Sequence, residues 1–279
     1  MQSTNEPPIN PSTFGPAPAA SSSASVLGAG QGISIAFVYH NLISRPTCPT
    51  DGDHLIKAQT LRNLIGHFKG PLAPGALRHV RAELRKGCDE EMKRFRNEKT
   101  ARAVERTLRR FTKTLERLKV SGKEWKALGP GVKTAYRQGW RAYQTVLEDS
   151  SPENFHEWRK CAKDLWYHVR LLQPVWPEQM DATASELDAL GECLGDDHDL
   201  VVLRQDVQAR SIGDGNAREI ETLNGLIEER QRELRATALE MGARFYAEKP
   251  SVFCKRLAGY WKTWRREKKP LTQPAAANA

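Results

Sequence analysis

The feature that most constrains the fold of this chain is a helical repeat of apolar residues, with no alternating pattern typical of strands. From about residue 76 onward, apolar residues recur every three or four positions. That spacing puts apolar side chains on one face of a helix, whereas a strand requires alternation. The predicted helices cover residues 76–97, 99–119, 131–148, 152–173, 178–211, 215–247 and, as a shorter element, 251–266. We therefore predict an all-α fold, an antiparallel helical bundle.

The breaks between these helices have identifiable causes. The stretch VSGKEWKALGPGV, residues 120–132, contains three glycines and a proline, which stop helices. Ser151 followed by Pro152 fits an N-cap and a first helical position. Pro174 and Pro177 end the helix that follows, and the SIGDGN sequence at 211–216 predicts a turn.

Composition divides the chain into four parts. Residues 1–32 are rich in Pro, Ser, Ala and Gly, and we expect them and the tail 267–279 to be disordered. Residues 33–75 are poorly defined, although HLIKAQTLRNLIGHF at 54–68 predicts a short helix; residues 76–266 form the helical domain. The apolar run 33–39 is too short to span a bilayer, and the start lacks the pattern of a secretory signal. We expect a cytoplasmic location.

The chain is basic, with a formal net charge of +9 and an isoelectric point near 9.4. A charge of this sign points to an anionic partner, such as a nucleic acid, an anionic membrane or another polyanion. The five cysteines have no CxxC spacing, so neither a disulfide framework nor a zinc site is predicted. No cofactor is predicted either.

The stretch HEWRKCAKDLWYHVRLL, residues 156–172, is two-sided. On a helical wheel, six hydrogen-bond donors share about 100° of arc, and no acid lies among them: His156, Arg159, Lys160, Lys163, Tyr167 and Arg170. The opposite side is apolar: Trp158, Cys161, Ala162, Leu165, Val169 and Leu172. Stacked cations repel one another by a few tenths of a kcal/mol per pair. The donors are thus a solvated face, are matched by acids of a neighbouring helix, or serve an anionic ligand.

A second helix repeats the arrangement. Its cations share one arc opposite Val104 and Leu108: Arg102, Arg106, Arg109, Arg110, Lys113 and Arg117. Glu105 and Glu116 lie at the margins, which favours a solvated face more strongly than in the first helix.

The stretch ELDALGECLGDDHDLVVL, residues 186–203, is the third distinctive segment. Gly191 and Gly195, one turn apart, would permit close helix contact. His198 and the aspartates around it fit a metal or acid–base site. Alternatively, Asp196 or Asp199 holds a cation of the neighbouring helix.

HEWRKCAKDLWYHVRLLQPVWP and LGECLGDDHDLVVL together resemble the CHAD family, the conserved histidine α-helical domain, over about residues 76–247. The resemblance implies a bundle of two pseudo-repeated halves around a basic channel. It further implies binding of inorganic polyphosphate, sometimes at polyphosphate granules, without catalysis. The six donors of 156–170 would face the channel, with His198 and Asp199 nearby.

One part of the family pattern is missing. The N-terminal half of the family carries its own HxxRKxxKxxR helix, and we find no such motif before residue 76. The N-terminal half therefore looks truncated or diverged, and an apolar surface left by that loss would favour a homodimer.

Two other functions stay open. A metal-dependent phosphohydrolase acting on phosphoanhydrides would need a carboxylate cluster, for which Asp196, Asp197 and Asp199 are the candidates. Nucleic-acid binding would need exposed aromatics, and Trp261 and Trp264 in the basic C-terminal helix are better placed than Trp158. That helix is interpreted mainly as an amphipathic packing element, and nucleic acid is the less expected partner.

Overall fold

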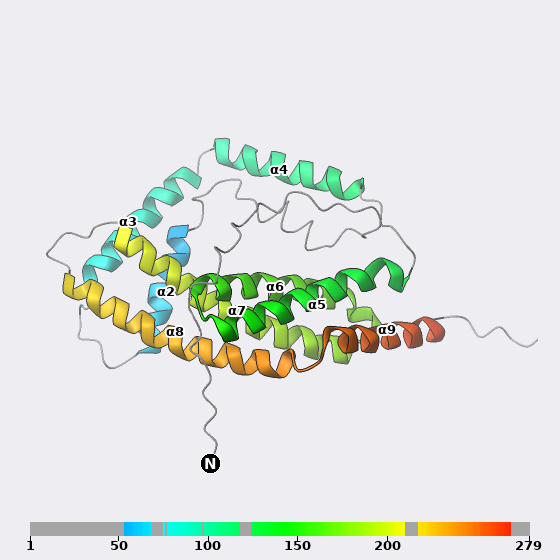
Figure 1. Cartoon of the computed structure of the whole chain (residues 1–279). Helices are drawn as coiled ribbons and strands as arrows, with labels where there is room; N and C mark the ends of the chain where they lie inside the picture. The colour runs from blue at the N-terminus through cyan, green and yellow to red at the C-terminus, as the bar shows by residue number, and fades with distance from the viewer. Residues whose placement is uncertain are drawn as a thin grey trace, which may run out of the picture. The chain divides into compact units, whose positions relative to one another are not determined.

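The computed structural model describes residues 53–68, 75, 77–95, 98–117, 124–209 and 217–268. The chain divides into two compact units, residues 1–31 and 32–279, and every described residue belongs to the second. The described residues form helices and contain no strand, which confirms the all-α prediction (Figure 1). The predicted disordered segment 1–32 and the tail beyond Lys268 lie outside the described residues.

The helices are, in chain order, α2 (Asp53–His67), α3 (Arg78–Phe95), α4 (Glu98–Glu116), α5 (Trp125–Glu148), α6 (Pro152–Leu171), a 3₁₀ turn η1 (Gln173–Val175), α7 (Pro177–Ala209), α8 (Ala217–Phe245) and α9 (Pro250–Glu267). The short helix predicted at 54–68 is α2. The other predicted ends agree within a few residues, except at the start of α5.

The predicted start of α5 is wrong. The helix begins at Trp125 and continues through Gly129, Pro130 and Gly131, which local propensity predicts as a break. A Cβ atom at Gly131 would lie 3.1 Å from Nε2 of His168 on α6. The missing side chain therefore lets α5 approach α6 closely, and this packing outweighs the weak helix propensity of glycine.

The predicted start of α6 is confirmed in part. Pro152 is the first helical residue and Ser151 is the extended N-cap residue, but the Ser151 side chain caps no helical N–H. Its hydroxyl instead donates to Oδ2 of Asp149 at 3.1 Å. Glu153 in the first turn places a negative charge at the positive end of the helix dipole.

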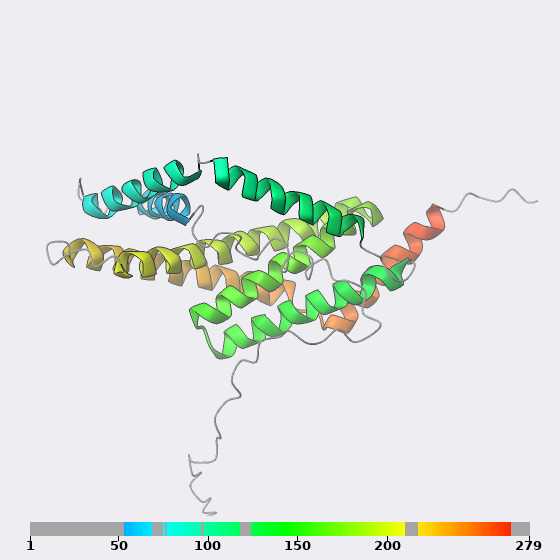
Figure 2. The same ribbon diagram turned by 90° about the horizontal axis from the view of Figure 1, so that it is seen from above.

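Helix α7 is the central element, because it packs against α2, α6 and α8. Figure 2 shows it running between the α2–α3 pair and the α5–α6 pair. One apolar core joins its first half to α5, α6, α9 and the end of α8, around the fully buried Trp158 and Tyr136. A second core joins its last third to α2, α3 and the start of α8, around Leu203 and Ile227.

The two cores meet where α7 carries the sequence LGDDHDL. Leu194 belongs to the first core and Leu200 to the second. The polar residues between these two leucines therefore lie where α2, α6 and α8 all approach α7. The fold places the most distinctive motif of the sequence at this junction.

A candidate polyanion-binding site

The two-sided character predicted for 156–172 is confirmed. The apolar side of α6 is buried in the first core: Phe155, Trp158, Ala162, Leu165 and Val169. The six predicted donors, which we call the basic row, are half-buried apart from the exposed Arg170: His156, Arg159, Lys160, Lys163, Tyr167 and Arg170. His168, which does not belong to the row, is buried, with its Nδ1 atom 2.7 Å from the carbonyl oxygen of Asp164.

The basic row lies along α7, which packs against α6. A Cβ atom at Gly191 would lie 3.9 Å from Cγ of Lys163, and one at Gly195 would lie 3.4 Å from Nε of Arg159. The ring of His156 lies against the ring of His198, with centroids 4.2 Å apart. The two glycines thus lie directly beneath basic side chains of α6, at distances that are ordinary van der Waals contacts for a Cβ atom.

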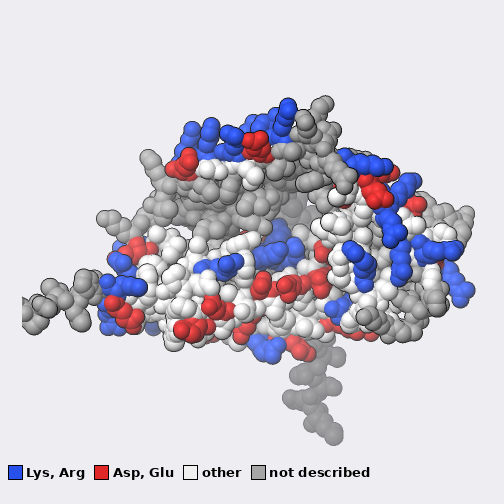
Figure 3. All heavy atoms as spheres, turned by 180° about the vertical axis from the view of Figure 1, so that it is seen from behind, with Lys and Arg blue, Asp and Glu red and all other residues white. Residues whose placement is uncertain are grey.

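The cations of the row form no direct ion pair with α7 among the described residues, although Asp199 lies close enough to interact with Arg159 and Lys163. Among the described residues, no ion pair joins Arg159, Lys163 or Arg170 to an acid. Lys160 pairs with Glu157 of its own helix at 2.7 Å, and Arg170 lies over the ring of Trp166 at 4.7 Å. Figure 3 shows a face on which a group of Lys and Arg atoms lies next to a row of Asp and Glu atoms.

Two buried polar atoms of the row have no hydrogen-bond partner among the described residues, namely Nδ1 of His156 and Nε of Arg159. A buried donor or acceptor without a partner costs about 1–3 kcal/mol. A guanidinium and a protonated imidazole both donate to phosphate, so a shift of either side chain toward the surface would let a ligand oxygen satisfy it.

Burial governs the titration of the groups around the row. It lowers the pKa of His156, with further lowering by His198 and by Lys160. The pKa of His198 is also lowered, first by burial and then by Arg159. The pKa of Asp199 is raised, because burial outweighs the opposing effect of Arg159 and Lys163. Both imidazoles are therefore mainly neutral near pH 7, and each would gain a proton most readily beside an anion.

Among the described residues, Asp197 is the aspartate of this motif that forms an ion pair, whereas Asp196 or Asp199 was predicted from the sequence. Asp197, with a side chain only 2% exposed, accepts from Nε of Arg235 at 2.8 Å and from the amide of Gln231 at 3.1 Å, both on α8. Arg235 also lies over the ring of Phe155 on α6, at 4.7 Å. Asp197 therefore fixes α7 between α6 and α8, and so fixes His198 beside His156.

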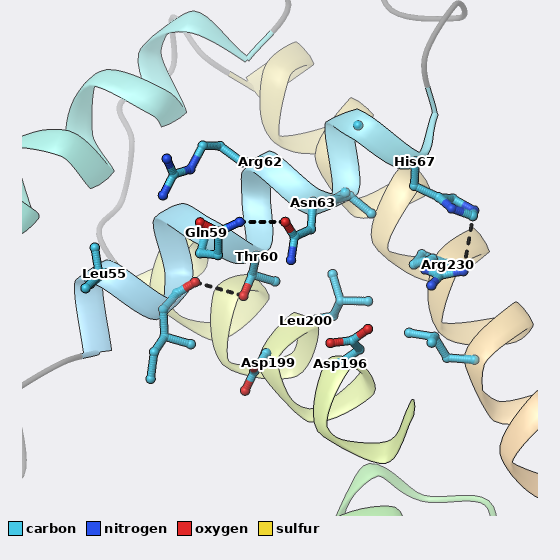
Figure 4. Close-up of a pocket in the computed structure, with 14 residues that line it drawn as sticks. Leu55, Gln59, Thr60, Arg62, Asn63, His67, Asp196, Asp199, Leu200 and Arg230 are labelled. Atoms are coloured by element: carbon cyan, nitrogen blue, oxygen red, sulfur yellow. Dashed lines mark hydrogen bonds between the residues drawn. The ribbon is translucent and has the colours of Figure 1, made fainter. Parts of the chain in front are cut away.

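Asp196 and Asp199 face a cavity of 850 Å³ between α2, α7 and α8 (Figure 4). Helix α2 contributes Gln59 and Asn63, joined by a 2.6 Å hydrogen bond, and α8 contributes Arg230. The pKa of Asp196 is raised by burial, although Arg230 opposes this. No group of three or more His, Cys, Asp or Glu side chains suited to a metal ion occurs in the part of the chain described.

Helix α2 forms part of this junction, which was not predicted from the sequence, although its residues carry a signal for it. His54 and Lys57 have the same spacing as His156 and Arg159. Lys57 is buried and pairs with Asp206 of α7 at 2.9 Å. The rest of the motif has diverged, since Leu61 and Ile65 stand where α6 has Lys163 and Tyr167.

The second predicted set of cations, on α4, does not lie beside the basic row of α6. Helix α4 packs against α3 and makes no comparable contact with α6. All six of its predicted cations are exposed: Arg102, Arg106, Arg109, Arg110, Lys113 and Arg117. Arg109 donates twice to Glu105 of its own helix, as the marginal acids suggested.

The C-terminal helix α9 packs against α5, and its aromatic side chains are only partly available. Trp261 contacts the first core and lies 6.0 Å from Trp125, ring to ring. Trp264 is half-buried too. This arrangement agrees with a packing element more than with a base-stacking surface.

The fold and the site together define an all-helical protein with a basic row along one helix, beside an aspartate- and histidine-rich turn of its neighbour. The chain belongs to the CHAD family, because the CHAD domain model matches residues 53–208. The match begins at α2, within the segment predicted to be poorly defined. Searches of the curated proteins and of the solved structures gave no match. No helix in the described ranges has both the length and the apolar character needed to cross a membrane.

Proposed function

We propose that this protein binds inorganic polyphosphate through the basic row of α6, without catalysing a reaction on it. The observation that carries the proposal is the state of the row: Arg159 and Lys163 lie over glycines and make no ion pair within the described chain. Membership of the CHAD family, known for polyphosphate binding, supports the same ligand.

The row suits an extended polyanion better than a single small anion. Side chains on successive helical turns are about 5–6 Å apart, so the row offers a series of donors along one line. Arginine provides planar, bidentate donors for phosphate, whereas lysine provides a compact charge. A polyphosphate chain would contact several of these groups at once, each contributing to affinity.

Binding of this kind should release counterions and weaken steeply with salt, as it does for nucleic acids. A titration with long-chain polyphosphate at several salt concentrations measures that slope. The double variant Lys163→Glu/Arg170→Glu should bind at least about tenfold more weakly. Its matched control is Lys133→Glu/Arg137→Glu, an equal charge change at exposed positions of α5. Equal affinities of the two double variants would refute the assignment to α6.

A metal-dependent phosphohydrolase is the alternative, motivated by the aspartates next to the row. Incubation of the protein and polyphosphate with Mg²⁺ or Mn²⁺, followed by measurement of released phosphate, separates the two functions. Release that Asp196→Asn/Asp199→Asn abolishes would replace the binding proposal with an enzymatic one. A location in the cytoplasm or at polyphosphate granules stays a prediction.

A further inference from the structure

A second groove, separate from the basic row, lies between α2 and α3. It has a volume of 1020 Å³, and the described residues that line it come from these two helices and from Gly75. Its floor contains Leu61 and Leu84, each only 2% exposed, which belong to the second core. The two walls of the groove differ in chemistry.

The α2 wall is mainly apolar, with Arg62 as its charged residue. Leu55, Ala58 and Ile65 line it from one helix face, on which Arg62 occupies the turn between Ala58 and Ile65. Leu55 keeps 58% of its surface exposed, and Ala58 and Ile65 are partly buried. An apolar strip of this kind gains stability when another apolar surface covers it, at about 25 cal/mol per Å².

The α3 wall is basic. Arg78, Arg81 and Arg85 are exposed, follow one another on adjacent turns and line the groove, and the exposed Arg62 lines it from α2. No ion pair or hydrogen bond joins these four side chains to another described residue. Stacked arginines on one helix repel each other, so the arrangement costs stability unless an anionic partner is present.

We propose that this groove binds an amphipathic α-helix of a partner protein, with acidic residues along one edge and apolar residues along the next. The apolar edge would cover Leu55 and Ile65, and the acidic edge would pair with Arg78, Arg81 and Arg85. Amphipathic helices bind in apolar grooves between helices by this geometry. Charge complementarity along the α3 wall would fix the register and favour acidic partners over others.

The shape and the chemistry disfavour two other anionic partners. A bilayer surface is flat, whereas this site is a concave groove between two packed helices, and a third helix can lie along such a groove with its side chains inserted. Polyphosphate would pair with the arginines but would leave the α2 wall without an apolar contact. Asp89 lines the groove together with Lys86, so an acidic edge fits best over the arginines and away from Asp89.

The probe is a displayed library of amphipathic helices, about 16 residues long, with two randomised edges. The full-length protein is the target. Enriched helices should carry acids every three or four residues beside leucine or isoleucine. Synthetic versions should bind Arg81→Glu/Arg85→Glu at least about tenfold more weakly than the wild type. They should bind Lys133→Glu/Arg137→Glu, which has the same net charge, like the wild type.

A charge-swap measurement makes the test sharper. An enriched helix with its glutamates replaced by lysines should prefer Arg81→Glu/Arg85→Glu to the wild type. Circular dichroism verifies that the variant is folded. Absence of enrichment, or equal binding of the enriched helices to both double variants, would overturn the proposal. So would anionic vesicles that bind through these arginines while the helices do not.

Polyphosphate titration keeps this proposal distinct from the function proposed for α6. Arg81→Glu/Arg85→Glu should retain polyphosphate affinity close to that of Lys133→Glu/Arg137→Glu. If it loses as much affinity as Lys163→Glu/Arg170→Glu, the arginines belong to the polyphosphate site and the helix-docking proposal fails.

Discussion

Replacing Asp197 with alanine should destabilise the protein strongly, although Asp197 is not one of the residues proposed to bind polyphosphate. The carboxylate is almost fully buried and accepts two hydrogen bonds from Arg235, at 2.8 and 3.3 Å, and one from Gln231. Its removal leaves a guanidinium only 23% exposed without its counter-charge. Breaking a buried ion pair from one side costs about 3–5 kcal/mol.

That loss corresponds to a fall of roughly 6–20 °C in the melting temperature, since a unit of this size loses about 2–4 °C per kcal/mol. Thermal unfolding followed by far-UV circular dichroism measures it. Asp188→Ala, an exposed position of the same helix, is the control and should change stability by less than about 0.5 kcal/mol. The double variant Asp197→Leu/Arg235→Leu should recover part of the loss, because apolar residues can replace a buried ion pair.

Asp197→Ala should also weaken polyphosphate binding. Asp197 and Arg235 hold α6, α7 and α8 together at the point where His198 contacts His156. A melting temperature for Asp197→Ala within a degree or two of that for Asp188→Ala would refute the reasoning. The buried ion pair of Asp197 and Arg235 would then contribute no more to the free energy of unfolding than an exposed ion pair does.

Three further predictions concern helix packing, the pH dependence of binding and the oligomeric state. Gly242→Ala should lower the melting temperature, because its Cβ would lie 2.6 Å from Trp158 and 2.7 Å from Tyr143; overpacking costs about 1–3 kcal/mol, more than the helix-propensity gain. Gly225→Ala, with no heavy atom within 4 Å, should raise it, and equal effects of the two changes would contradict this account. Polyphosphate should bind more tightly as the pH falls from about 8 to 6, because an anion raises the lowered pKa of His156 and of His198 and binding then takes up protons. His156→Asn/His198→Asn should reduce this pH dependence, and an unchanged slope would exclude the two histidines as its source. Size-exclusion chromatography with light scattering should show a homodimer, and a clean monomer would end that hypothesis.

Much of the fold follows from local chemistry that the sequence displays directly. The helix from Pro152 to Leu171 begins at a proline preceded by serine, and its apolar and basic sides can be assigned by periodicity alone. Periodicity predicts which face is buried because the alternative would expose Trp158 and Leu165 to water. The motifs of α6 and α7 also indicate the family by themselves, because their residue types and spacing are specific.

Local preference fails where a distant residue supplies the deciding contact. Gly129 and Gly131 should end a helix, yet α5 runs through them because the second glycine accommodates His168 of another helix. The sequence DDHD cannot reveal which aspartate is paired, since Arg235 lies 38 residues further along the chain. The sequence also leaves open whether the cations of α4 lie beside the basic row of α6. They do not, because the direction of a helix is set by loops and by core packing.

The sequence by itself therefore determined most of the helices, the buried face of α6 and the presence of a row of donors on its other side, whereas Leu108, on the side of α4 predicted to be apolar, is exposed. Periodicity and charge are properties of neighbouring residues, so they can be read along the chain. Only the tertiary structure decided what stands opposite that row: two glycines, a histidine ring and, among the described residues, no acid paired with Arg159 or Lys163. The residues opposite the row belong to α7, a different helix. Their register against α6 depends on how the two apolar cores pack along α7, which the sequence of α6 does not contain.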